Sequence, residues 1–402
     1  MQQKVYLPVN WTDGMKINKH HFRAEQQACN WQLSMVSRAW LNEYNYGLFS
    51  QAGPGAGWGS SGMGRPLVVT TDNQQQVSVR LLSCQALTPG GHLVFFGEEG
   101  TVTGAAGGAG TGDAGVNGLQ MPYADLAAAN ADYYVVLAVD PYDRQPVGQP
   151  DTGESQLRAP FTAPSYSLQL VPRQDMPAGR PAEFYLPVGK IKVREGKVLT
   201  DEEYIPPCTS TAAHPALVEI HATLEHFFGS MELHVLRIQQ KIIQKRQQNN
   251  LASVILELCD KMNTYMSGEY QRLLQEYKHQ PPVYMFRSVA GLARLMKNSL
   301  DVYAGTVKDE LLAYFADWCG VTQGGLESAS VSLCNHRYNH IEIREAVRQV
   351  LQFTGLVLPL FDSLAALDYI GKKKEAGIFV KEHLVVPGEE VPVVRRRSFL
   401  AE

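Results

Sequence analysis

Three side chains that can hold a metal ion lie close together near the end of the sequence: Cys334, His336 and His340. Thiolate and imidazole groups are ligands that zinc prefers, and the two histidines would share one face of a helix. However, the segment up to Asn335 is expected to precede a helix, and no HExxH glutamate accompanies the histidines. We therefore expect packing roles for these side chains and no metal site.

Other patterns that would carry chemistry are weak or absent. Residues 110–115, GTGDAG, match G-x-G-x-x-G, but glycine and alanine flank them where a dinucleotide fold needs a strand and a helix. Residues 59–62, GSSG, lack the spacing of a nucleophile elbow, and no Walker A loop occurs. The six cysteines form no C-x-x-C pair, which indicates reduced thiols. The sequence thus predicts no catalytic residue and no cofactor, so we expect a protein that is not an enzyme.

Composition limits the partners and the location of the chain. Its 402 residues carry 36 basic and 40 acidic side chains, a net charge of -4, which argues against a nucleic-acid binder. The first ten residues lack the features of a secretory signal, and the longest apolar run, residues 356–361, contains Pro359. We expect a cytoplasmic protein of two or three domains.

The first half, residues 1–206, is predicted to be a β-sandwich. Short runs of β-branched and aromatic residues recur there, separated by turn formers such as residues 89–91 and 140–143. The expected strands cover residues 66–71, 77–82, 92–96, 133–139, 166–171 and 190–193.

Three other segments interrupt these expected strands. Two glycine-rich stretches, residues 53–64 and 97–118, are expected to be loops. A helix is expected between His20 and Asn42, because apolar residues recur there on a three-four repeat: Phe22, Cys29, Leu33, Val36 and Trp40.

The second half, residues 207–370, changes to a helical period. From Leu217 to Ile242 a heptad seam with one polar member, His221, includes Leu224, Phe228, Met231, Val235, Ile238 and Ile242. Further helices are expected over residues 251–277, residues 283–318 and from Asn339 onward, with a kink at Pro359. Four helices with short connections predict an antiparallel bundle, followed by a short segment, residues 371–402, with a possible hairpin at 378–387. The predicted fold class is therefore α+β and multidomain.

Several short motifs, in one order along the chain, resemble the TssK family of type VI secretion baseplate subunits. Each motif is weak alone, and the shared order over residues 5–370 carries the resemblance. The motifs are Trp11-Thr12-Asp13-Gly14-Met15 with His20-His21-Phe22-Arg23, Asn45-Tyr46-Gly47-Leu48, Leu186-Pro187-Val188-Gly189-Lys190-Ile191, Tyr204-Ile205-Pro206-Pro207-Cys208, Pro282-Val283-Tyr284, Ala290-Gly291-Leu292-Ala293 and Tyr338-Asn339-His340.

The resemblance implies a non-catalytic homotrimer that links the wedge proteins TssF and TssG to the membrane complex. It implies that the sandwich binds the wedge proteins, the bundle forms the trimer and the C-terminal part, here shortened, reaches the membrane complex. On this basis the wedge-side residues would be Trp11, Gly14, Met15, His21 and Phe22, the hinge Pro206 and Pro207, and the oligomer seam the six residues from Leu224 to Ile242.

Two rival hypotheses predict different features of the same chain. A phage-like tail receptor-binding protein shares the plan of a sandwich followed by helices, but would end in a substantial binding head. A β-sandwich enzyme such as a glycosidase would need a cleft with two carboxylates, and no spacing in the sequence singles out such a pair.

Overall fold

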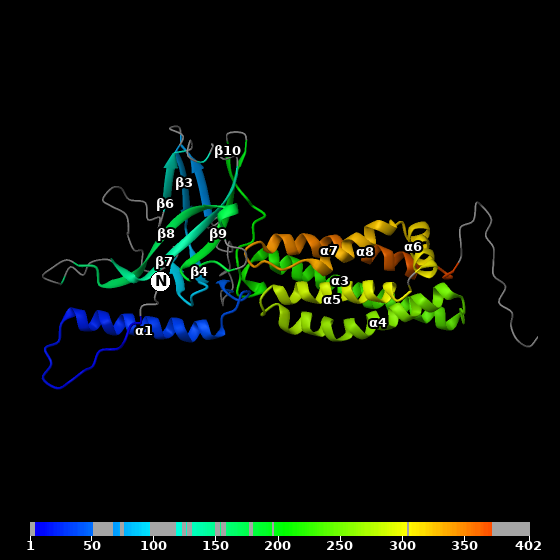
Figure 1. Ribbon diagram of the computed structural model, residues 1–402, viewed down its shortest axis with the longest axis horizontal. Coiled ribbons are helices and arrows are strands. Elements are labelled where there is room, and N and C mark those ends of the chain that lie inside the picture. The colour runs from blue at the N-terminus through cyan, green and yellow to red at the C-terminus, as the bar shows by residue number, and fades with distance from the viewer. Residues whose placement is uncertain are drawn as a thin grey trace, which may run out of the picture.

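The computed structural model describes residues 5–50, 67–72, 76–96, 118–122, 126, 131–148, 153, 158–176, 180–194, 197–303 and 305–371. Strands gather at one end of an elongated molecule and a bundle of helices forms the other end (Figure 1). The change from strands to helices falls between Thr200 and Pro215. The α+β, multidomain fold class predicted from the sequence is confirmed.

The strand region contains three antiparallel sheets. The largest has the order β10-β9-β7-β8, and the other two have the orders β2-β3-β6 and β1-β4-β5. The strands are β1 (Gly47–Leu48), β2 (Leu67–Thr71), β3 (Gln76–Leu81), β4 (Cys84–Leu87), β5 (Leu93–Phe96), β6 (Gly118–Pro122), β7 (Asp132–Val147), β8 (Phe161–Pro172), β9 (Tyr185–Arg194) and β10 (Lys197–Thr200).

Strand β7 is covered on both of its faces. Val135 and Leu137 belong to the main core, whereas Tyr134 and Val136 form a second small cluster with Tyr204 and Ile341. A strand covered on both faces reads as a continuous apolar run, which explains the sequence YYVVLAV at residues 133–139.

The structure changes some details of the predicted strands. Residues 140–143, expected to be a turn, lie within β7, where the pairing with β8 shifts register between Asp140 and Arg144. Such an irregularity lets one long strand bend without ending. Strands β1, β4, β6 and β10 were not predicted, and the glycine-rich residues 53–64 and 97–117 lie outside the described residues.

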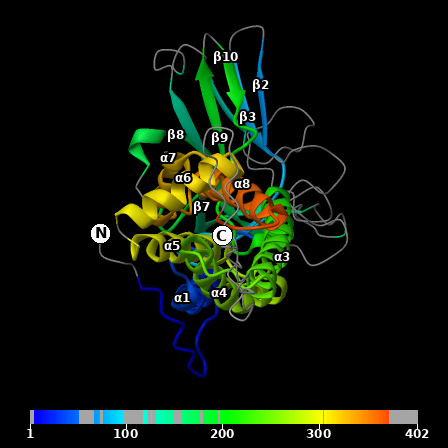
Figure 2. The same cartoon turned by 90° about the vertical axis from the view of Figure 1, so that its right-hand side faces the viewer.

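The helical half contains α3 (Pro215–Gln244), α4 (Asn250–Arg272), α5 (Val283–Asp301), α6 (Thr306–Cys319), α7 (Gln323–Asn335) and α8 (Ile343–Ala366), with a π-helical turn at Leu273–Tyr277. Figure 2 shows these helices side by side when viewed toward the end of the molecule. The single helix expected over residues 283–318 is two helices, because the chain turns at Gly305, whose φ is +88°. Helix α7 was missed, and its range includes Ser332–Asn335, which was expected to precede a helix.

The predicted heptad seam of α3 packs inside the chain's own bundle. Its six residues Leu224, Phe228, Met231, Val235, Ile238 and Ile242 are at most 2% exposed. Their contact surface is therefore used within one chain, which corrects their assignment to an interface between protomers. His221, the polar member of the seam, bonds through Nε2 to the Leu273 carbonyl oxygen at 2.9 Å.

Helix α8 occupies the middle of the bundle. It contains Pro359 and buries Val350, Phe353 and Phe361. Among the described helices it alone has the length and apolar composition that would permit crossing a membrane, and half of its most apolar window is buried. Core helices meet the same test, and the packing of α8 in the bundle explains its composition.

Candidate protein interface

Helix α1 (Lys19–Trp40) begins at a capping box. The Asn18 side chain accepts from the backbone N–H of His20 at 2.9 Å, and His21 Nδ1 accepts from the backbone N–H of Asn18 at 3.4 Å. These bonds satisfy amide groups that a helix start leaves without partners. His21, predicted as an interface residue, thus has a local structural role at the start of α1.

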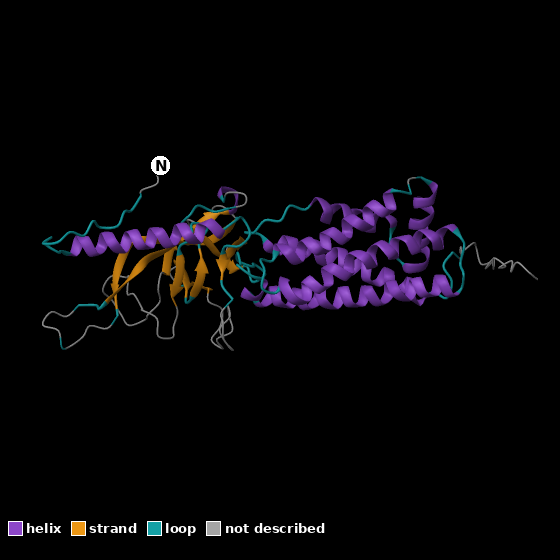
Figure 3. Ribbon diagram, turned by 90° about the horizontal axis from the view of Figure 1, so that it is seen from below, coloured by secondary structure: helices purple, strands orange, loops and turns teal. Residues whose placement is uncertain are grey.

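One face of α1 rests on the strand region. Ala28 and Ser34 are its buried residues, and Arg38 forms an ion pair with Glu183. Gly91, at φ +80°, allows the close approach, since a Cβ there would collide with the Ser34 carbonyl oxygen. Figure 3 shows α1 along one side of the strands, apart from the bundle.

The opposite face of α1, called the outer face below, carries the apolar stripe predicted from the sequence. Its residues are Phe22, Cys29, Leu33, Val36 and Trp40, and all five are exposed. The four large side chains are 61–81% exposed. A contiguous apolar surface of this kind is typical of a site that binds another protein.

The loop before α1 brings the predicted wedge-side residues together. Gly14, at φ +75°, lies in a turn closed by a bond from the Met15 N–H to the Thr12 carbonyl oxygen at 3.2 Å. The Trp11 ring lies 5.9 Å from that of His21 and 6.2 Å from that of Phe22. Trp11 and Phe22 are 45% and 62% exposed, so neither is a core residue of the sandwich.

The connection between the two halves is a buried strap. Leu48 donates its N–H to the Pro207 carbonyl oxygen at 2.8 Å and accepts from the Thr209 N–H at 2.9 Å. Gly47 has a φ of +115°, and a Cβ there would collide with the Pro207 carbonyl. Pro206 and Pro207, predicted as the hinge, are buried in this strap, so the geometry is that of a stiff joint.

A buried histidine fastens the same strap to the bundle. His340 Nε2 lies 2.9 Å from the Tyr46 carbonyl oxygen, and Nδ1 lies 2.9 Å from the Tyr338 hydroxyl. Burial lowers the pKa of His340 to about 4, so the ring is neutral at pH 7. A neutral ring donates from one nitrogen and accepts at the other, which matches a Tyr46 carbonyl and a Tyr338 hydroxyl as partners.

A buried ion pair crosses the junction next to this histidine. Lys190 of β9, 5% exposed, donates to Glu342 Oε1 at 3.0 Å, and the Tyr134 hydroxyl donates to the same oxygen. Arg173 Nε lies 3.6 Å from Oε1. Burial, followed by the bond to Glu342, raises the pKa of Tyr134. These contacts tie two strands of the largest sheet to the start of α8.

The junction collects four motifs that are far apart in the sequence: residues 45–48, 186–191, 204–208 and 338–340. Sequence reasoning identified these segments but missed Glu342, because no motif marks this carboxylate. Of the predicted trio Cys334, His336 and His340, the last has both ring nitrogens bonded to protein groups, and a search of the described residues finds no group of three or more metal-binding side chains.

The chain thus has a strand region and a helical bundle joined through a buried strap, and a helix with an exposed apolar face. The family model for bacterial type VI secretion (EvfL, ImpJ, VasE) matches residues 65–293, more than half of the chain. The chain belongs to this family, and the resemblance to TssK drawn from its motifs is confirmed.

Solved structures similar to this chain include a crystal structure of TssK, at 13% identity and a TM-score of 0.48, covering 87% of this chain and 69% of that one. TssK from the type VI secretion system of EAEC in complex with a nanobody gives 14% identity and a TM-score of 0.43, covering 84% and 99%. A chain of a TssK-TssF-TssG baseplate subcomplex has 14% sequence identity and a TM-score of 0.43, and the match covers 90% of this chain and 100% of that one. No curated protein matches in a sequence comparison.

Proposed function

We propose that this chain is a structural adaptor of the type VI secretion baseplate and carries no catalytic role. The observation that carries this proposal is the exposed outer face of α1 on a protein of the type VI secretion family. Large apolar side chains at 61–81% exposure gain free energy when a partner covers them, about 1.5–3 kcal/mol for each fully buried side chain.

The partners we propose for the outer face are the wedge proteins TssF and TssG. Trp11 extends the face at its N-terminal end, where the loop with the Gly14 turn places its ring 6.2 Å from that of Phe22. Aromatic side chains are the usual anchors of protein interfaces, which fits a contact at this end.

We also propose that three copies of the chain assemble, at the cytoplasmic face of the inner membrane. Because the α3 seam is buried within one chain, the trimer requires a different surface. Helix α8 runs away from the strands, so the described part of the chain ends at the end of the bundle opposite the strands, on the side proposed to approach the membrane complex (Figure 1). Light scattering on the purified chain tests the proposed trimer, because it measures whether the particle has the mass of three chains.

The adaptor role is tested by co-purification of the chain with TssF and TssG from its own secretion system. Val36→Glu places a charge in the middle of the outer face, and Ala39→Glu places the same charge at another exposed position of α1. We expect Val36→Glu to lose both wedge proteins and Ala39→Glu to retain them. Retention by both variants contradicts the outer face as the binding site.

A further inference from the structure

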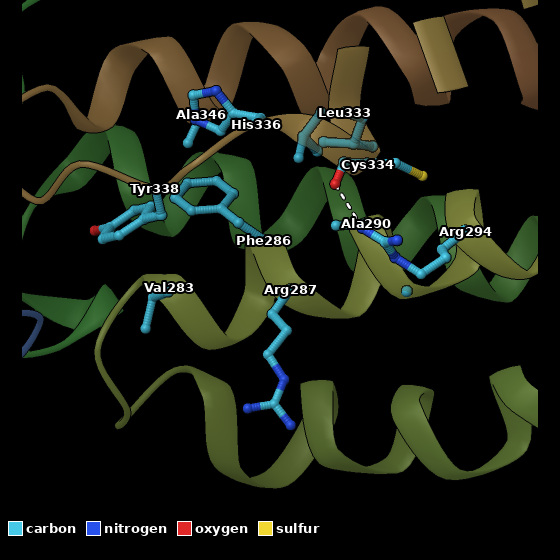
Figure 4. A pocket seen from close by; sticks show the side chains of 12 residues that line it. Val283, Phe286, Arg287, Ala290, Arg294, Leu333, Cys334, His336, Tyr338 and Ala346 are labelled. Atoms are coloured by element: carbon cyan, nitrogen blue, oxygen red, sulfur yellow. Dashed lines mark hydrogen bonds between the residues drawn. The ribbon is translucent and has the colours of Figure 1, made fainter. Parts of the chain in front are cut away.

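A pocket in the helical half lies well away from α1 and is not used by the adaptor contact. It has a volume of about 350 Å³ and lies between α5, α7 and the start of α8. The size is within the range of pockets that hold a ligand or a partner's side chain. Figure 4 shows its lining, in which the apolar members are Val283, Phe286, Ala290, Leu333, Ala346 and Val350.

The pocket opens onto the surface of the bundle. Phe286 and Leu333 are 5% and 3% exposed, whereas Val283 and Ala290 are half-buried and Arg287 is exposed. The lining therefore grades from a buried apolar floor to an accessible rim. A depression of this shape can hold one side chain of a partner segment whose backbone lies across the opening.

The rim carries two arginine side chains, Arg287 and Arg294. Arg294 donates to the Cys334 carbonyl oxygen at 2.6 Å, whereas Arg287 is an exposed side chain that extends from α5 away from the apolar lining (Figure 4). Among the described residues, no carboxylate lies within ion-pair distance of either guanidinium. Each guanidinium has five N–H donors, so both retain donors for an anionic group.

Another polar group of the lining has an atom without a partner. His336 Nε2 is buried and has no hydrogen-bond partner within the described part of the chain. A buried polar atom without a partner costs free energy that a bound group can recover. His336 lines the pocket together with the apolar side chains and the two arginines.

We propose that this pocket is a second protein-docking point, which takes one aromatic or aliphatic side chain of a partner segment whose neighbouring residues are acidic. The apolar floor receives the side chain, and Arg287 and Arg294 receive the flanking carboxylates. The proposal is independent of the outer face of α1, because the two surfaces share no residue.

The test uses fluorescein-labelled seven-residue peptides and the full chain, with binding followed by fluorescence anisotropy. Each peptide has a central Phe, Trp, Leu or Ile between two Glu residues, and a matched set has Gln in place of Glu. We expect at least one Glu-flanked peptide to bind, and its Gln-flanked counterpart to bind about fivefold more weakly.

Three variants locate the binding. Ala290→Phe fills the pocket from a half-buried position and should weaken binding at least about tenfold. Arg287→Gln should weaken it about threefold, whereas Arg237→Gln, at an exposed position of α3, should not change it. Circular dichroism confirms that each variant is folded.

Four outcomes overturn the proposal: no peptide of the Glu-flanked set binds, Ala290→Phe binds as the wild type does, the Gln-flanked set binds equally well, or decanoate binds the pocket while the peptides do not. The last outcome would assign the pocket to a small amphiphilic anion. The variant Val36→Glu should bind the peptides normally, which separates this result from a failure of the adaptor proposal.

Discussion

Helices α1 and α3 carry the same kind of sequence pattern and use it in opposite ways. Each has apolar residues on a three-four repeat, but the stripe of α3 is at most 2% exposed at its six seam positions, and the large side chains of α1's outer face are 61–81% exposed. The repeat predicts that a helix has one apolar face. It does not say whether that face is covered by the same chain or by another one.

The difference lies in what surrounds each helix. Helix α3 contacts both α4 and α8 along the bundle, so its seam is covered within the chain. Helix α1 meets the strands through small residues, Ala28 and Ser34, on the face opposite its apolar stripe. The junction resembles α3 in this respect, because its polar side chains find their partners within the chain: Lys190 bonds to Glu342, and His340 bonds to the Tyr46 carbonyl oxygen.

The largest expected effect comes from placing a charge in each stripe. Val235→Asp puts a carboxylate at a fully buried position of α3 and should lower the free energy of unfolding by about 4 kcal/mol or more. Val36→Asp, on the outer face of α1, should change it by less than about 1 kcal/mol. Urea unfolding followed by circular dichroism measures both, with Leu236→Asp as a control at an exposed position of α3. Equal losses of unfolding free energy in Val235→Asp and Val36→Asp would contradict the difference in burial between the two stripes.

The junction is tested by removing one charge from its buried pair. Glu342→Gln leaves Lys190 buried without a counter-charge and should lower the free energy of unfolding by about 3 kcal/mol. Glu345→Gln, three residues along, removes an exposed pair with Arg348 and should cost less than about 1 kcal/mol. If the two variants have equal stability in urea unfolding, the junction is not held by this pair.

The stability of the junction should also depend on pH. In the unfolded chain a histidine binds a proton below about pH 6.5, but His340 in the folded chain stays neutral down to its pKa of about 4. The contribution of His340 is therefore complete above pH 6.5 and is lost as the pH falls toward 4, by up to about 3 kcal/mol.

Thermal unfolding between pH 7.5 and 4.5 checks this prediction. His340→Gln should reduce the loss of melting temperature at low pH, although His214, whose pKa burial lowers to about 4, contributes in the same direction. His226→Gln, an exposed position on α3, is the control and should keep the wild-type profile. A wild-type profile for His340→Gln would contradict the assignment.

The smallest effects come from two glycines in neighbouring helices. A Cβ at Gly291 of α5 would collide with the Tyr265 hydroxyl of α4, so Gly291→Ala should lower the free energy of unfolding by about 1–3 kcal/mol. Gly268 of α4 has no neighbour within 4 Å of such a Cβ, so Gly268→Ala should raise it by about 0.5–1 kcal/mol. Equal signs in urea unfolding would show that close packing of α4 and α5 does not require Gly291.

Sequence reasoning predicted the parts of this fold that depend on local pattern. The strand runs, the range of α1 and the seam of α3 follow from periodicity. The break between α5 and α6 was missed because Gly305 lies among residues that favour a helix. Helix α7 was missed because Gly324 and Gly325 at its start indicate a chain reversal as readily as a helix.

The candidate sites were only partly predictable, for a physical reason. Lys190 and Tyr46 lie in motifs that the sequence marks, but their partners Glu342 and His340 are brought to them only by the packing of the strands on α8. The exposure of Phe22, Leu33 and Trp40 is likewise a property of the whole fold. Local pattern gives a helix its apolar face, and only the tertiary structure shows which surface is left uncovered.

The most direct test of this account is the reactivity of Cys29, a natural thiol in the outer face of α1. Alkylation by iodoacetamide, followed by mass spectrometry of the Cys29 peptide, gives its rate in the free chain and in a complex with TssF and TssG. We predict rapid reaction in the free chain and at least tenfold slower reaction in the complex, about the effect of 1.4 kcal/mol. Equal rates in both states would contradict the assignment of the outer face to the wedge proteins.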